Sequence, residues 1–272
     1  MIPIFVISLP QATQKQELIK RHMQRLGIPF EFVSGVDGRL LSEDELQKVF
    51  DKEKSYNYFK WYRNRTGSAG VELSRGEIGC TLAHRKVYQK IVVENIERAV
   101  VLEDDVLATE DFLPIIEKVI ANIEQNSIEK NLIIKLDDTL SSSYGGFGKL
   151  GIKLKNVLNR SLRPIKIKID KELAIVKTSM NFGGAQGYII DNAAAKTMLN
   201  VNNPVFIISD EWNYYANFIT IRALSKTIAP VKIDCSDIWN MKKPEHTPIP
   251  FKYRYIGLLK KIVTKIYLFL WR

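Results

Sequence analysis

The chain contains little cysteine and no long hydrophobic run. Its two cysteines, Cys80 and Cys235, lie far apart in 272 residues without a paired spacing, so we expect reduced thiols in a cytoplasmic protein. No stretch reaches the roughly 18 consecutive apolar residues that a membrane-spanning helix needs. Residues 1–9 are apolar but lack the basic start and the length of a signal peptide, which favours a buried first strand.

The chain also lacks acidic residues after Glu245. Its net charge of +10 indicates an anionic partner; because no nucleic-acid-binding module occurs along the chain, we expect a membrane or a phosphorylated substrate and no nucleic acid. Residues 246–272 combine basic, apolar and aromatic side chains, a pattern typical of an amphipathic helix on an anionic membrane surface. A terminal helix packed on its own domain is the alternative. The basic residues of this tail are Lys252, Arg254, Lys260, Lys261, Lys265 and Arg272.

What the chain does contain is ordinary material for one mixed α/β domain, with 46% hydrophobic and 26% charged residues. Residues 4–9 have the pattern of a strand, and residues 11–26 have that of a helix closed by Gly27. Residues 30–33 follow as a second strand before a turn at Asp37 and Gly38. A strand, a helix and a strand in this order predict a parallel sheet.

The rest of the chain continues this alternation without an internal repeat. Ser42 and Glu45 have the spacing of a capping box at a helix start, whereas residues 51–72 are polar, aromatic and glycine-bearing and are expected to form a surface loop. Further helices are predicted at 74–93, 112–123 and 192–199, and further strands at 99–103, 132–136, 187–190 and 231–233.

The most informative feature is a run of three acids at a predicted strand end. Residues 99–102 are apolar, and Glu103, Asp104 and Asp105 follow them. Carboxylates repel one another and resist burial, so a divalent cation, Mn²⁺ or Mg²⁺, would resolve the conflict. Residues i and i+2 of a strand share a face, so we predict that Asp105 and Glu103 bind the metal while Asp104 points elsewhere. An acidic cluster that caps the next helix is the alternative.

Several segments together resemble glycosyltransferase family 25, the lipopolysaccharide-type transferases that include bacterial lipooligosaccharide galactosyltransferases. They occur in the family's order and cover roughly residues 2–240. The similar segments are Val6-Ile7-Ser8-Leu9, Gly27-Ile28-Pro29-Phe30-Glu31-Phe32, Val36-Asp37-Gly38, Leu73-Ser74-Arg75-Gly76-Glu77-Ile78-Gly79-Cys80, Ala83-His84, Leu102-Glu103-Asp104-Asp105-Val106 and Gly184-Ala185-Gln186-Gly187-Tyr188-Ile189-Ile190.

This resemblance implies a GT-A fold, with a Rossmann-like, mostly parallel central sheet flanked by helices. It also implies a UDP-sugar donor, a bound divalent metal and an inverting transfer, commonly of galactose from UDP-galactose in a β linkage. We therefore expect a catalytic domain over residues 1–245, with a nucleotide-binding half at about 1–106 and an acceptor half at about 107–245, followed by the membrane-associating tail. The expected acceptor is a lipid-linked oligosaccharide of lipopolysaccharide or lipooligosaccharide. The protein would act as a peripheral protein on the cytoplasmic face of the bacterial inner membrane.

Inverting transfer needs a base that takes the proton of the acceptor hydroxyl. Asp210 is our candidate, because it follows the apolar run 205–208 and the family places an aspartate at the matching position. Glu211 is the adjacent rival, and helix capping is the structural alternative for Asp210. The aromatic segment 212–215 is expected to line the acceptor site. Asp137 and Asp138 form a second acidic strand end, which would bind sugar hydroxyls or supply the base instead.

The predicted nucleotide-sugar site draws on several parts of the chain. Asp37 is placed to meet the uridine, with an ordinary turn aspartate as the alternative. His84 has either a donor-site role, which its family match favours, or that of a hydrogen-bonded core histidine. Glycines around Gln186 would let the backbone approach the sugar, or merely form a tight strand entry. The full set is Ser8, Leu9, Asp37, Gly38, Arg75, Glu77, His84, Glu103, Asp104, Lys135, Asp137, Asp138, Gly184, Gln186 and Gly187.

Other functions remain open at this point. The same residues would serve UDP-glucose or another UDP-hexose equally well. A phosphotransferase or phosphatase usually needs a nucleophilic aspartate followed by a second one and a helix-capping Gly/Thr turn, and residues 103–107 lack that turn. The non-enzymatic alternative is a glycan-binding or membrane-binding module of the same fold, against which the joint presence of Glu103, Asp105 and Asp210 argues.

Overall fold

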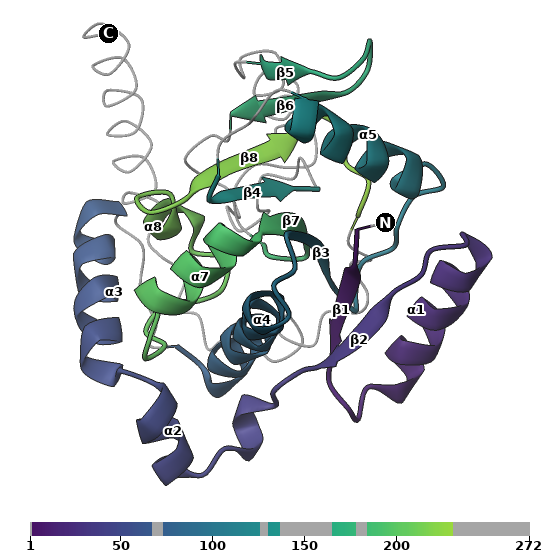
Figure 1. Ribbon diagram of the computed structural model, residues 1–272. Helices are drawn as coiled ribbons and strands as arrows, with labels where there is room; N and C mark the ends of the chain where they lie inside the picture. Colours follow the sequence, from purple (N-terminus) through teal and green to yellow (C-terminus); the bar gives the residue numbers. More distant parts are fainter. Residues whose placement is uncertain (1, 67–72, 126–129, 137–164, 178–183, 231–272) are drawn as a thin grey trace, which may run out of the picture.

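The computed structural model describes residues 2–66, 73–125, 130–136, 165–177 and 184–230. Its centre is one eight-stranded sheet with the strand order β2-β1-β3-β7-β4-β8-β6-β5 (Figure 1). The strands are β1 (Ile4–Ser8), β2 (Glu31–Ser34), β3 (Arg98–Glu103), β4 (Leu132–Lys135), β5 (Ile165–Lys168), β6 (Ala174–Lys177), β7 (Gly187–Asp191) and β8 (Thr220–Leu224). The helices are α1 (Thr13–Arg25), α2 (Glu43–Val49), α3 (Lys52–Thr66), α4 (Arg75–Val93), α5 (Phe112–Gln125), α7 (Asn192–Val201), α8 (Trp212–Tyr215) and the 3₁₀ turn η1 (Gly38–Leu40).

Most strands of the sheet run in one direction. β1 pairs in parallel with β2 and β3, and β4 pairs in parallel with β8. β7 is antiparallel to both β3 and β4, and β6 is antiparallel to both β8 and β5. Only β6 and β7 among the described strands are therefore reversed. The predicted α/β fold with a mostly parallel central sheet flanked by helices is confirmed.

Helices cover both faces of the sheet. α4 and α7 pack side by side on one face, where Val87, Val101 and Ile190 share a buried cluster (Figure 1). α1 and α5 supply Met23 and Ile116 to a second buried cluster on the other face. Because successive side chains of a strand point to opposite faces, β3 feeds both clusters, with Val101 on one side and Leu102 on the other.

Local sequence signals set the helix ends as predicted. Gly27 closes α1 in the left-handed conformation, with φ of +65°, which glycine adopts without steric cost. Ser42 and Glu45 form the predicted capping box of α2. A second capping box joins Ser74 to Glu77 at the start of α4. Both boxes satisfy backbone N–H groups that a helix start would otherwise leave unpaired.

The prediction of a surface loop over residues 51–72 was wrong. Residues 52–66 form α3, which begins where the Asp51 carboxylate accepts a hydrogen bond from the backbone N–H of Lys54 at 2.8 Å. The Tyr58 ring packs edge-on against the rings of Phe206 and Tyr214. Aromatic residues that suggested an irregular loop thus attach a helix to the rest of the domain.

Some predictions lie outside the described residues. These are Asp137 and Asp138, the strand at 231–233, Cys235 and the tail at 246–272. Strands β5, β6 and β8 had no counterpart among the predicted elements. Across the part of the chain that the structure describes, none of the helices combines the length and hydrophobicity that crossing a bilayer requires.

Candidate active site

The candidate site lies where β3 and β4 end and β7 begins. The backbone N–H of Glu103 donates to the carbonyl of Gln186 at 2.8 Å, and that of Leu136 donates to the carbonyl of Gly187 at 3.0 Å. The first turns of α4 and the segment before α8 close the site from one side, where Cys80 Sγ lies 3.7 Å from Ser209 Oγ. This is the carboxyl edge of the parallel strands, where α/β folds commonly hold ligands.

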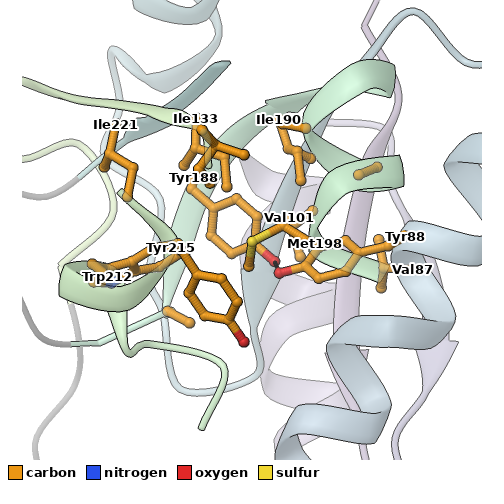
Figure 2. Close-up of a cluster of buried hydrophobic side chains, with 14 of the residues drawn as sticks. Val87, Tyr88, Val101, Ile133, Tyr188, Ile190, Met198, Trp212, Tyr215 and Ile221 are labelled. Carbon is orange, nitrogen blue, oxygen red and sulfur yellow. Dashed lines mark hydrogen bonds between the residues drawn. The ribbon is translucent and has the colours of Figure 1, made fainter. Parts of the chain in front are cut away.

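Glu103 is held by a chain of buried side chains. Its Oε1 lies 3.1 Å from Nε2 of His84, whose Nδ1 lies 2.7 Å from the hydroxyl of Tyr188. The Tyr188 hydroxyl in turn lies 2.8 Å from that of Tyr88, and Figure 2 shows the two hydroxyls meeting between β7 and α4. His84 is therefore a hydrogen-bonded core residue, as the structural alternative predicted, and it contacts the first residue of the acidic run. Its donor-site role stays a prediction.

The donors in this chain follow from its chemistry. An ionised Glu103 only accepts hydrogen bonds, so His84 donates to it from Nε2. A neutral imidazole then accepts at Nδ1, which makes the Tyr188 hydroxyl the donor to His84 and leaves its oxygen to accept from Tyr88. The donors in this series of hydrogen bonds thus point toward Glu103, and they fix the orientation of its carboxylate.

Asp104 lies apart from Glu103, on the side of β1 and α1. Its Oδ2 accepts a hydrogen bond from Ser8 Oγ at 2.7 Å, and its Oδ1 lies 3.7 Å from Nζ of Lys15. Ser8 and Asp104, both predicted site residues, thus contact each other. The Leu9 side chain is half-buried, and its carbonyl accepts from Gln16 at 2.8 Å, which anchors the turn into α1.

Asp105 has the least favourable electrostatic environment of the three acids. Its Oδ1 is buried and has no hydrogen-bond partner among the residues that the structure describes. Burial, and after it the charges of Glu103 and Asp104, raise its pKa to about 7. A carboxylate in this position is poorly solvated and repelled by its neighbours, and a bound cation would relieve both penalties.

Two sets of donor atoms at this position fit a cation. Glu103 and Asp105 offer carboxylate oxygens, which suit Mn²⁺ or Mg²⁺. Cys80 Sγ, His84 Nε2 and Glu103 Oε1 lie within 4.8 Å of one another, a set of the kind that zinc prefers. Burial raises the pKa of the Cys80 thiol well above its usual range, as it also raises that of Asp105, so the pKa shifts do not separate the two sets. The buried Oδ1 of Asp105, which has no partner among the described residues, favours the oxygen set.

Asp210 faces the same site from another element. Its Oδ2 accepts a hydrogen bond from the backbone N–H of Gly184 at 2.6 Å. Burial raises its pKa, the Gly184 hydrogen bond and the charge of Lys135 oppose that rise, and the charge of Glu103 adds to it. Asp210 and Glu103 are thus close enough to interact, although they are far apart in the sequence.

The surroundings of Asp210 differ from the predicted ones. The sequence favours a base at a second strand end, whereas residues 205–209 make one isolated bridge, between Val205 and Phe50, and Asp210 lies in a turn. Trp212 and Tyr215 are buried, and Trp212 Nε1 donates to the carbonyl of Gly184 at 3.0 Å. The prediction that segment 212–215 lines an acceptor site was wrong for these two residues, because their rings pack into the core.

Lys135 and Glu211 flank Asp210 from opposite sides. Lys135 is fully buried at the end of β4, with its ammonium 5.8 Å from the centre of the Trp212 ring. The carboxyl group of Glu211 accepts hydrogen bonds from Tyr58 and Asn213, so it lies against α3. Burial, with the charge of Asp210 next, raises the pKa of Glu211 to about 7.

Other predicted donor-site residues have structural partners. Asp37 Oδ2 accepts from Gln11 at 2.8 Å, and Asp37 Oδ1 accepts from Nε of Arg39 at 2.6 Å. Arg75 donates to the carbonyl of Leu41 and pairs with Glu43. Glu77 belongs to the α4 capping box, and Gly38 packs against the first turn of α4. Asp37 and Arg75 thus have contacts with residues other than those around Glu103.

The glycine-bearing segment before β7 does reach the cluster. Gly184 has φ of +80°, and a Cβ there would collide with the Gln186 side chain. A Cβ at Gly187 would lie 3.2 Å from Leu102 and Ala229, so this glycine serves close packing. Gln186 Oε1 is buried without a partner among the described residues, which leaves an acceptor at the site.

The sequence interpretation missed Cys80, Ser209, Tyr88 and Tyr188 as members of the site. Cys80 and His84 are four residues apart on one helix, which puts them on one face, and that spacing was the available signal. Tyr88 extends the same face by one more turn. Tyr188 is brought to them only by the pairing of β7 with β3, which no local pattern reveals.

Comparisons with known proteins identify the family of the chain. The model of glycosyltransferase family 25, described as an LPS biosynthesis protein, matches residues 1–212. Human procollagen galactosyltransferase 2 is 31% identical over 130 residues, 48% of this chain and 20% of that protein. A rat protein named probable inactive glycosyltransferase 25 family member 3 is 29% identical over 48% of this chain and 22% of its own length. The chain thus spans about a fifth of the length of these curated relatives.

Among solved structures, apo UDP-glucose pyrophosphorylase aligns with 82% of this chain and 90% of its own, with a TM-score of 0.36 and 13% identity. The family model covers more than half of the chain and includes the acidic run, the segment before β7 and Asp210. The chain therefore belongs to glycosyltransferase family 25.

Proposed function

We propose that the protein is an inverting, metal-dependent glycosyltransferase that moves a hexose, galactose from UDP-galactose, in a β linkage onto a lipooligosaccharide or lipopolysaccharide acceptor. The observation that carries the proposal is the meeting of Asp105, Glu103 and Asp210 at one edge of the sheet. The names of the galactosyltransferase relatives support galactose as the sugar. UDP-glucose and other UDP-hexoses are the competing donors.

Glu103 and Asp105 would hold the divalent cation, which when bound stabilises the diphosphate of the leaving UDP. His84 fixes Glu103 through the 3.1 Å contact, so this carboxylate is positioned before any ligand arrives. Oδ1 of Asp105 and Oε1 of Gln186 are buried and have no hydrogen-bond partner among the described residues. A polar ligand would therefore bind to them without breaking a hydrogen bond within that part of the protein.

Asp210 would take the proton of the acceptor hydroxyl. The Gly184 N–H holds one of its oxygens, so the carboxylate is oriented. Burial makes it a stronger base than an exposed aspartate, while the Gly184 hydrogen bond and the charge of Lys135 favour its ionised form. A positioned base of this kind contributes roughly 10²- to 10⁴-fold in rate.

A non-catalytic module is the second candidate, because one relative is named as a probable inactive family member. The donor atoms and Asp210 described above argue for turnover. Incubation with Mn²⁺ and a panel of UDP-hexoses, with and without oligosaccharide released from lipooligosaccharide, separates the two. Metal-dependent UDP release that the acceptor accelerates supports the transferase, and its absence with every donor rejects it. Linkage analysis of the product then tests the β-galactoside.

We also propose that the basic tail, residues 246–272, binds the anionic inner face of the bacterial inner membrane, where a lipid-linked acceptor would lie. Its support is the absence of acids after Glu245 together with six basic residues. Truncation after Pro250 should abolish sedimentation with anionic vesicles and spare transfer to a soluble acceptor. Replacement of Lys260, Lys261 and Lys265 by glutamine should weaken the same binding. Unchanged sedimentation of both variants would rule out this role.

A further inference from the structure

A pocket of about 350 Å³ lies between α2, α3 and the first turns of α4, outside the cluster around Glu103. Its volume falls near the lower end of the range of roughly 300–1,000 Å³ that small-molecule sites occupy. Residues from three separate helices line it, so its shape depends on the tertiary fold. The residues that matter for its chemistry are Glu43, Gln47, Phe50, Ser55, Tyr56 and Arg75.

Ser55 marks this pocket as a binding site. Its side chain is 2% exposed, and its Oγ has no hydrogen-bond partner among the residues that the structure describes. A buried hydroxyl without a partner costs free energy, so such groups are rare unless a ligand or water satisfies them. Ser55 lines the pocket, so a ligand hydroxyl there would meet it.

The other lining residues favour a neutral, polyhydroxylated ligand. Tyr56 is 50% exposed and lines the pocket together with Phe50; the Lys60 ammonium lies 5.9 Å from the centre of the Tyr56 ring. Gln47 supplies an amide that both donates and accepts. The guanidinium of Arg75 is already paired with Glu43 and bonded to the Leu41 carbonyl, so its charge is compensated. Lys52 also lines the pocket, which leaves its lining with one more cation than anions. The aromatic rings, and the groups that both donate and accept hydrogen bonds, favour a sugar there over a phosphate.

The pocket is connected to the Asp210 side of the candidate site. Asp51 N–H donates to the Val205 carbonyl at 2.8 Å, which ties the α2–α3 junction to the segment that leads to Asp210. Tyr58, one turn beyond Ser55 on α3, hydrogen-bonds Glu211. Ile78 lines the pocket and His84 lies on the same helix, separated by ~9 Å at 1.5 Å per residue.

We propose that this pocket binds a hexose unit of the acceptor glycan, with Ser55 as hydrogen-bond partner and Tyr56 as stacking surface. The proposal rests on the proposed transferase function, because it assigns the pocket to the acceptor. It places the acceptor on the side of α2 and α3, which Trp212 and Tyr215 do not line.

Changing Ser55 or Tyr56 should impair acceptor binding and leave donor binding unchanged. Ser55→Leu and Tyr56→Ala should each raise the KM for the released oligosaccharide by roughly tenfold or more, since a site built to bond a hydroxyl discriminates strongly. The KM for the UDP-sugar and acceptor-independent UDP release should stay within about twofold. Ser55→Thr keeps the hydroxyl and should retain most of the affinity. Phe218→Ala is the matched control, because Phe218 is exposed but not among the pocket residues.

Equal acceptor KM values in wild type, Ser55→Leu and Tyr56→Ala would overturn the proposal. If the wild type transfers no sugar, the proposed function fails, and the pocket is then judged by binding alone. Saturation-transfer NMR with methyl glycosides of glucose, galactose and N-acetylglucosamine should give signals with the wild type that Ser55→Leu loses. Signals that are absent, or the same in both proteins, would reject the pocket as a sugar site. Circular dichroism of each variant verifies the fold.

Discussion

Nε2 of His84 lies 3.1 Å from Oε1 of Glu103, which connects the middle of α4 to the end of β3. The same imidazole contacts Tyr188 of β7 through Nδ1 at 2.7 Å. The His84 side chain thus connects α4, β3 and β7 at the edge of the sheet that carries the acidic run. Through this relationship, packing on the α4 face controls the orientation of a candidate metal ligand.

Replacing His84 should affect both stability and activity. His84→Ala leaves a cavity and removes the partners of Glu103 and of the Tyr188 hydroxyl, so we expect a loss of about 2–4 kcal/mol in the free energy of unfolding. Activity should fall by roughly 10- to 100-fold, the usual effect of losing a group that orients a metal ligand. Urea unfolding and steady-state kinetics measure the two effects.

Tyr88→Phe is the matched control for this chain. It removes the outermost hydroxyl but keeps the contacts from Tyr188 to His84 and from His84 to Glu103. It should cost about 1 kcal/mol in stability and leave the rate within a few-fold. An equal loss of activity in Tyr88→Phe and His84→Ala would show that the orientation of Glu103 is not what His84 contributes.

Asp105 and Asp104 should respond differently to the same substitution. Asp105→Asn removes a carboxylate that has no described partner, so without metal the protein should lose no stability. Addition of Mn²⁺ should raise the Tm of the wild type but not that of the variant, because a ligand at 100 times its Kd stabilises by about 2.7 kcal/mol. Activity of Asp105→Asn should fall at least about 10²-fold.

In Asp104→Asn the amide oxygen still accepts from Ser8, while the ion pair with Lys15 is lost. Because Asp104 is not a predicted metal ligand, activity should stay within a few-fold. Metal binding by electron paramagnetic resonance follows the same comparison directly. Loss of Mn²⁺ binding in Asp104→Asn, with binding retained in Asp105→Asn, would reverse the assignment of the two acids.

The acidic run shows which features of the site could be predicted from the sequence. Its position at a strand end followed from the apolar run before it. β3 ends at Glu103 and a turn follows, so the different environment of Asp104 comes from the turn and not from the two-residue period of a strand. The partners of Glu103 did not follow, because Tyr188 lies 104 residues after His84 and reaches it through the pairing of β7 with β3. Pairing between distant strands is a tertiary property that local pattern does not encode.

The predictions for residues 51–72 and 212–215 were wrong for a different reason. The aromatic residues of α3 and α8 predicted a loop and an acceptor surface. In the fold, Tyr58 packs on Tyr214 and Phe206, while Trp212 is buried beside Tyr188. Aromatic side chains suit a core and a sugar site equally well, so their type alone does not decide between burial and exposure.

Glu211 should make stability depend on pH in a definite direction. Its pKa rises from about 4.5 in the unfolded chain to about 7 in the fold. The folded state therefore binds the proton more tightly, so this group stabilises the fold below pH 4.5 and the contribution is lost as pH rises through 7. The difference in unfolding free energy, Glu211→Gln minus wild type, should increase by up to about 3 kcal/mol between pH 4.5 and 8.

Urea unfolding of both proteins across this range measures the difference. Asp105 also has a raised pKa, but it is present in both proteins and its contribution largely cancels in the comparison. Glutamine keeps the size of the side chain and its bonds to Tyr58 and Asn213. A difference that is constant with pH would show that Glu211 is ionised normally in the fold.

Asp210→Asn tests the candidate base. The amide oxygen can still accept from the Gly184 N–H, so the local structure should persist. Acceptor-dependent transfer should fall by about 10²- to 10⁴-fold, whereas slow UDP release without acceptor should change far less. A loss of less than tenfold would assign the base to another group, and Asp137→Asn and Asp138→Asn then identify it.

Gly38 and Gly79 should tolerate no side chain, for a reason unrelated to ligands. A Cβ at Gly38 would collide with the carbonyl oxygen of Arg75, and one at Gly79 would collide with that of Val36. Both obstacles are backbone atoms, which cannot rotate away, so η1 and α4 would have to separate. Gly79→Ala should therefore cost about 1–3 kcal/mol or more in the free energy of unfolding.

Gly76→Ala supplies the opposite result in the same helix. Its nearest heavy atom would be Ser74 Oγ at 3.9 Å, an ordinary contact, and alanine favours a helix by about 0.5–1 kcal/mol over glycine. Chemical denaturation should therefore order the proteins as Gly76→Ala, wild type and Gly79→Ala, from most to least stable. Because Gly38 was predicted to meet the nucleotide, Gly38→Ala separates the two roles. A stable Gly38→Ala protein with a raised KM for the UDP-sugar would assign this glycine to the donor site, whereas loss of stability assigns it to the contact between η1 and α4.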